Sequence, residues 1–64
     1  MSQQVTVEDL TYTGQTGLAI FVTDPDGNKV TLPKSEIEYD EDAEPGDVIE
    51  VEMPKWMALE RGLI

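Results

Sequence analysis

One segment of this 64-residue chain, residues 18–32, has the clearest structural pattern, and it reads Leu18-Ala19-Ile20-Phe21-Val22-Thr23-Asp24-Pro25-Asp26-Gly27-Asn28-Lys29-Val30-Thr31-Leu32. Its first six residues favour a strand, are apolar on both faces and are too few for a helix. Residues 24–28 predict a turn, because Pro25 presets φ for a turn position and Gly27 supplies a positive φ. Alternation then resumes, with Val30 and Leu32 on one face. The segment therefore predicts a β-hairpin whose first strand is central in the sheet.

Alternation of apolar and polar residues continues on both sides of this hairpin. Residues 4–12 alternate and predict a strand with a bend after Asp9, and residues 14–17 form a glycine-bounded turn. The alternation returns over residues 34–38 and again over residues 48–53. These patterns predict two further strands, joined by a polar loop.

The C-terminal residues predict a short helix. Pro54 fits its first turn, where the missing N–H costs nothing, and Gly62 fits the position just after its end. Trp56, Leu59 and Leu63 align on one side of this helix, and we expect the single Trp to cap the core. The predicted fold is mainly β (β+α). It consists of a curled four- to five-stranded antiparallel sheet, or a small barrel, with one short C-terminal helix.

Composition limits the classes of function. The chain has 14 acidic and 4 basic residues, a formal charge of −10, no Cys and no His. Residues 1–64 suffice for a single small domain, and this charge disfavours nucleic acid and anionic membranes as direct partners. The absence of Cys and His removes the usual nucleophile–base pairs and the commonest zinc ligands. The longest apolar run covers residues 18–22, and residues 1–4 do not resemble a signal peptide. We expect a cytoplasmic protein that is not an enzyme and has no cofactor.

Two acidic segments, residues 24–28 and 40–44, suggest calcium-binding loops. An EF-hand loop needs Gly at its sixth position and Glu at its twelfth. Counted from Asp24, these positions hold Lys29 and Ser35, and the acidic loop starting at Asp40 fails in the same way. A weak, partly hydrated cation site stays open as an alternative, but no residue is assigned as a metal ligand. A chain of this size also has little room for a cleft in which paired carboxylates could act on a substrate.

The acidic residues are concentrated in one part of the chain. Residues 36–52 hold nine of the fourteen acids and no Lys or Arg. On strands, Glu36, Glu38 and Asp40 would form one row of charges, and Glu50 and Glu52 another. Like charges on neighbouring strands are destabilising, so folding alone does not favour collecting them. The candidate partner-binding residues are Glu36, Glu38, Asp40, Glu41, Asp42, Glu44, Glu50 and Glu52. The alternative is a solvated face that only aids solubility.

Two short motifs resemble a known group of proteins. They are Leu32-Pro33-Lys34-Ser35 followed by Ile37, and Met53-Pro54-Lys55-Trp56-Met57-Ala58 ending in Gly62-Leu63-Ile64. This pattern, over about the C-terminal half, resembles small proteins of bacteriophages and mobile elements. Lys55 stands where an acidic residue is more usual in that pattern, which makes the helix N-terminus less favourably charged. In size and charge the chain is also similar to acidic anti-CRISPR and DNA-mimic inhibitors.

These observations lead to one main functional hypothesis and two alternatives. The chain is expected to block a basic, nucleic-acid-binding surface of a bacterial host protein by imitating DNA or RNA, and a CRISPR effector is one such protein. The first alternative is a structural or accessory module that self-associates through Trp56, Leu59, Leu63 and Ile64, with acidity serving solubility only. The second is a small-molecule sponge that holds ligands between subunits, although no residue identifies such a ligand.

Overall fold

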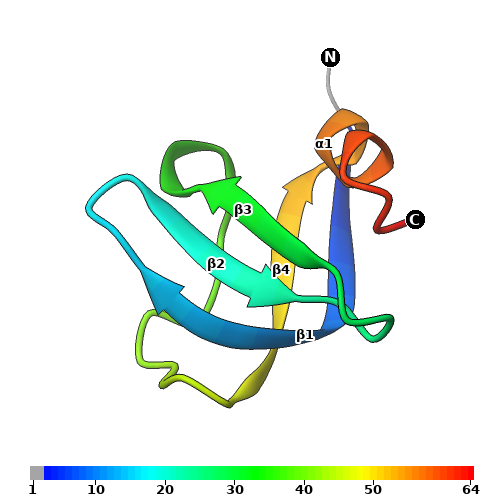
Figure 1. Ribbon diagram of the computed structural model, residues 1–64. Coiled ribbons are helices and arrows are strands. Elements are labelled where there is room, and N and C mark those ends of the chain that lie inside the picture. Colours follow the sequence, from blue (N-terminus) through cyan, green and yellow to red (C-terminus); the bar gives the residue numbers. More distant parts are fainter. Residues whose placement is uncertain (1–2) are drawn as a thin grey trace.

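A computed structural model of the chain describes residues 3–64. Four antiparallel strands form one open sheet in the order β3-β2-β1-β4. The strands are β1 (Gln4–Gln15), β2 (Ala19–Thr23), β3 (Lys29–Pro33) and β4 (Val48–Pro54), followed by the helix α1 (Lys55–Glu60). A single turn of 3-10 helix, η1 (Lys34–Glu36), follows β3. The prediction of a mainly-β fold with a curled antiparallel sheet and a C-terminal helix is confirmed (Figure 1).

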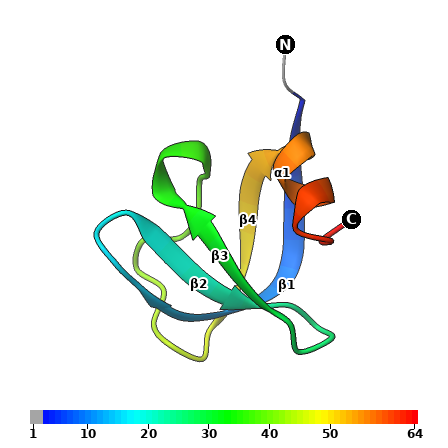
Figure 2. The same cartoon turned by 45° about the horizontal axis from the view of Figure 1, so that its top comes forward.

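The long strand β1 bends and so belongs to both halves of the sheet. Its first half pairs with β4 and its second half with β2, and the pairing with β4 is irregular between Val7 and Leu10. Asp9 lies inside this irregularity with φ of 62°, a left-handed conformation that Asp tolerates better than most residues. The bend predicted after Asp9 is therefore present, and the two halves of the sheet curl around a common core (Figure 2).

The hairpin between β2 and β3 is stabilised by one carboxylate. The side chain of Asp24 accepts hydrogen bonds from the backbone N–H groups of Asp26 and Asn28, at 3.0 and 2.8 Å. Gly27 has φ of 88° and donates its N–H to the Asp24 carbonyl. The bond from the Asn28 backbone N–H lowers the pKa of Asp24 below its ordinary value, because it favours the charged carboxylate. The predicted turn is confirmed, with the register that places β2 inside the sheet.

The prediction of a strand over residues 34–38 is wrong. Strand β3 ends at Pro33, and the Lys34 N–H donates the next hydrogen bond, to the Leu18 carbonyl. The chain then turns through η1. From there it crosses to the outer edge of β4, where Glu38 forms an isolated bridge with Glu52. Alternation persists because Ile37 is buried and Tyr39 is partly buried, although the backbone between them is not a strand.

The core lies inside the curled sheet and is closed at one end by α1. Met57 and Ala58, only 1% and 0% exposed, face this core, whereas Trp56 is 50% exposed. The expectation that Trp56 caps the core is therefore wrong, since Met57 occupies the inward side of the helix. Pro54 stands at the helix N-cap instead of in the first turn.

The end of α1 matches the prediction. The N–H of Gly62 bonds to the Leu59 carbonyl and that of Leu63 to the Ala58 carbonyl, at 3.1 and 2.8 Å. With φ of 72° at Gly62, these bonds form a Schellman motif. Leu63 packs partly against the core.

Candidate acidic interaction surface

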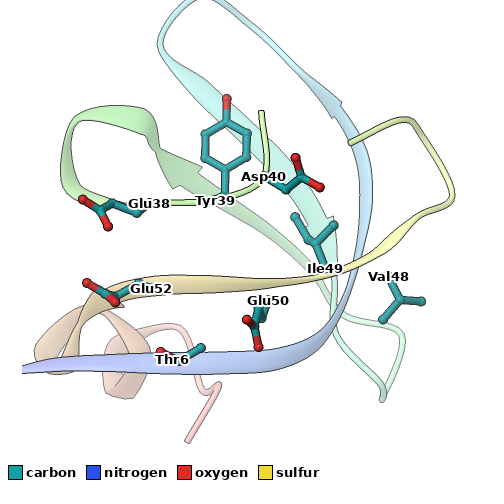
Figure 3. A pocket seen from close by; sticks show the side chains of 8 residues that line it. All are labelled: Thr6, Glu38, Tyr39, Asp40, Val48, Ile49, Glu50 and Glu52. Atoms are coloured by element: carbon teal, nitrogen blue, oxygen red, sulfur yellow. The ribbon is translucent and has the colours of Figure 1, made fainter. Parts of the chain in front are cut away.

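The site begins with two glutamates held opposite each other. The Glu38 N–H donates to the Glu52 carbonyl at 2.9 Å, and the Glu52 N–H donates to the Glu38 carbonyl at 2.8 Å. A pair that exchanges both backbone bonds places its side chains directly opposite, with Cα atoms about 5.5 Å apart. Figure 3 shows the two carboxylates projecting in the same direction from neighbouring segments. The residues expected to form the two acidic rows therefore lie next to each other at this one pair.

Strand β4 contributes a second carboxylate beside this pair. Ile49, Val51 and Met53 point into the core, which leaves Glu50 and Glu52 on the outer face, as the alternation predicted. Residues two apart on a strand lie about 6.6–6.8 Å from each other on the same face. Glu50 and Glu52 therefore form a short row along β4.

Two further acids join this face from β1, and sequence reasoning missed them. Val7 pairs with Val51 and Leu10 with Ile49, so Glu8 and Asp9 lie opposite Glu50 across the irregular part of the ladder. Both line one hollow together with Glu50. The alternation of β1 already placed Glu8 on an outer face, but only the pairing of β1 with β4 brings it beside Glu50.

Three neighbouring hollows connect these residues into one surface, which we call the acidic face. The central hollow is an open depression of about 510 Å³, and it is lined by Thr6, Glu38, Tyr39, Asp40, Val48, Ile49, Glu50 and Glu52 (Figure 3). It shares Glu50 with the hollow of Glu8 and Asp9, and it shares Glu38 and Glu52 with a hollow that Glu36 lines. The acidic face comprises Glu8, Asp9, Glu36, Glu38, Glu50 and Glu52.

The acidic loop, residues 40–47, has a defined structure beside this face. The Asp40 carboxylate accepts the N–H of Asp42 at 3.0 Å, and the Asp47 carboxylate accepts the N–H of Glu44 at 2.9 Å. Two backbone bonds tie the loop to Tyr12 of β1, one of them donated by Gly46. Asp40 therefore shapes its own turn instead of continuing a row from Glu38, which corrects the predicted three-residue row.

Three more candidate acids lie on this loop. Glu41, Asp42 and Glu44 are exposed. They extend the negative charge beyond the acidic face without forming a regular array. Partial burial and the nearby Glu41 raise the pKa of the Tyr39 hydroxyl above its ordinary value.

In the described part of the chain, the carboxylates of this surface form no ion pair with Lys or Arg. Over residues 3–64 the single ion pair joins Arg61 to Glu60, at the end of α1. Lys34 lines a hollow with Glu38 and Glu41 but forms no ion pair with either. Within the same residues, no three carboxylates are placed to hold a metal ion together.

The residues proposed for self-association occupy two environments. Trp56 and Leu59 are 50% and 55% exposed, on the outer side of α1, while Leu63 is partly buried against the core. Ile64 is also exposed. Leu63 therefore belongs mainly to the fold, and only the other three are available to a second copy.

Comparisons with family models, with curated proteins and with solved structures found no match for this chain. The resemblance to phage proteins therefore stays a prediction. Within residues 3–64, no helix combines the length and apolar character needed to cross a membrane.

Proposed function

We propose that this chain is an acidic inhibitor that binds and blocks a basic, nucleic-acid-binding surface of a bacterial host protein. The single observation that carries the proposal is the acidic face, on which Glu38, Glu50 and Glu52 lie together without a Lys or Arg partner among residues 3–64. Negative charge without internal compensation is costly in so small a domain. Its concentration on one face is what a surface that replaces nucleic acid requires.

The mechanism is occupation of the site where DNA or RNA would bind. Duplex DNA offers one negative charge for about every 1.7 Å of its axis, and a dense carboxylate face competes for the same Lys and Arg side chains. Complementary charge of this kind gives fast association that weakens as salt is added. Binding, and not catalysis, is the proposed activity, and the host cytoplasm is the compartment where such a partner is met. A CRISPR effector is one protein of this kind.

The test is affinity capture from a bacterial lysate with the chain immobilised. We expect the captured protein to bind nucleic acid, to leave the column at about 0.5 M NaCl and to be displaced by added duplex DNA. Replacing Glu36, Glu38, Glu50 and Glu52 with Gln should abolish capture while the free energy of unfolding holds or rises.

A matched pair of double variants controls for total charge. Glu50→Gln with Glu52→Gln and Asp26→Asn with Glu60→Gln each remove two negative charges from the −10 of the chain. Only the first pair lies on the acidic face. Equal loss of capture in both variants, or capture that persists in 0.5 M NaCl, would refute the proposal.

A further inference from the structure

The segment that carries Glu38 is a strap, residues 37–40, lying along the outer edge of β4. Ile37 anchors its start in the core, and the Glu38–Glu52 bridge provides its two backbone hydrogen bonds to the sheet. Among residues 3–64 this is the single bridge outside the named strands. Tyr39 packs partly against the core, and its hydroxyl makes one long contact, 3.5 Å, with the Gln15 side chain. The backbone hydrogen bonding of the strap to β4 therefore depends on one residue pair, while Ile37 and Tyr39 hold it by packing.

That residue pair carries two like charges. Glu38 and Glu52 face each other directly, and like charges at such positions destabilise the pairing. Glu50 lies on β4 beside them, and Asp40 follows on the strap, so every titratable neighbour in the central hollow besides Tyr39 is also acidic. Lys34, on the other side of the strap, makes no ion pair with Glu38. Repulsion at the bridge opposes the hydrogen bonds that form it.

We infer that the strap exchanges between a bridged and a released state, and that positive charge at the acidic face sets the ratio. Local opening costs far less than global unfolding where few contacts hold a segment. Cations that gather at Glu38 and Glu52 reduce the repulsion only in the bridged state, where the two side chains are close, so they shift the strap toward that state. This inference rests on the bridge and its charges and holds whether or not the acidic face binds a host protein.

Amide hydrogen exchange followed by NMR tests the inference that the strap opens and closes, with protection factors measured at 20 and 500 mM NaCl. Protection of the Glu38 and Glu52 amides should rise about two- to fivefold at the higher salt, the factor expected when a cross-strand charge interaction is screened. At 20 mM NaCl, Glu38→Gln should raise protection of the Glu52 amide by a similar factor. Asp26→Asn removes one charge from the distant β2–β3 turn and should leave that amide unchanged. Amides of the β1–β2 ladder report global unfolding.

Four results would overturn the inference. The first is protection at Glu38 and Glu52 that responds neither to NaCl nor to Glu38→Gln. The second is an equal rise in Asp26→Asn, and the third is a rise shared by the β1–β2 ladder, which would show a change in global stability only. The last is absence of protection at both amides under all conditions, because the bridge would then not exist in solution.

Discussion

Removing one carboxylate from the acidic face should stabilise this protein, and Glu52→Gln is the sharpest case. Glu52 faces Glu38 across the bridge and has Glu50 two residues away on the same side of β4. At about 5.5 and 6.7 Å, unit charges in water repel by about 0.75 and about 0.6 kcal/mol, before side-chain motion and salt reduce both values. A gain of about 1 kcal/mol at low salt follows, which corresponds to about 4–8 °C in Tm for a domain of this size.

The assay is thermal unfolding followed by circular dichroism at 10 and 500 mM NaCl. The Debye length falls from about 30 Å to about 4 Å between these conditions, so the gain should shrink to about a third or less. Glu60→Gln is the matched control, because Glu60 is paired with Arg61 and its loss brings no relief of repulsion. A Glu52→Gln variant with unchanged or lower Tm at 10 mM NaCl, or an equal gain in Glu60→Gln, would refute the reasoning.

Three further predictions concern the fold. Gly62→Ala should destabilise the protein by about 1 kcal/mol in urea unfolding, because φ of 72° is unfavourable for a residue with a Cβ. An unchanged urea midpoint would contradict the conclusion that α1 ends in a Schellman motif. Leu10→Ala should cost about 2–5 kcal/mol, since Leu10 is fully buried, and retention of the wild-type near-ultraviolet spectrum and urea midpoint would contradict this packing. The lowered pKa of Asp24 means that its contribution to stability is present above the ordinary Asp range near pH 4 and is lost as pH falls through the folded value. Asp24→Ala should therefore be less stable than wild type at pH 7 and approach it at pH 2, and an equal difference at both pH values would contradict the turn hydrogen bonds.

The strands were predictable because each has a local cause. The Asp-Pro-Asp-Gly-Asn turn, residues 24–28, specifies its hairpin through bonds between residues two to four apart. In β4 the inward positions of Ile49 and Val51 follow from alternation alone. The strand predicted over residues 34–38 is not present, because the alternation there comes from a segment that crosses from β3 to β4. Ile37 and Tyr39 point inward from a crossing segment, and only the position of β4 decides where that segment lies.

The acidic face was predictable only in part, for the same reason. Glu50 and Glu52 share a face by strand geometry, which the sequence contains. Their neighbours Glu8 and Asp9 come from a strand about forty residues earlier, and their proximity depends on long-range pairing. Trp56 shows the opposite error, since its size suggested burial while Met57 and Ala58 occupy the inward side of α1.

Solubility alone is the main alternative explanation of the acids. A soluble domain of this size is well served by mixed charges spread over its surface, which would avoid the repulsion between Glu38 and Glu52. The predicted gain in stability when that repulsion is removed would show that the arrangement is costly to the fold.

The affinity of the captured host protein for two double variants tests the proposed function most directly. Dissociation constants would be measured by calorimetry from 50 to 500 mM NaCl. We predict that Glu50→Gln with Glu52→Gln weakens binding at least about tenfold at low salt, whereas Asp26→Asn with Glu60→Gln stays within about twofold of wild type. Equal affinities for the two variants, or a wild-type affinity that does not change with salt, would contradict the role proposed for the acidic face.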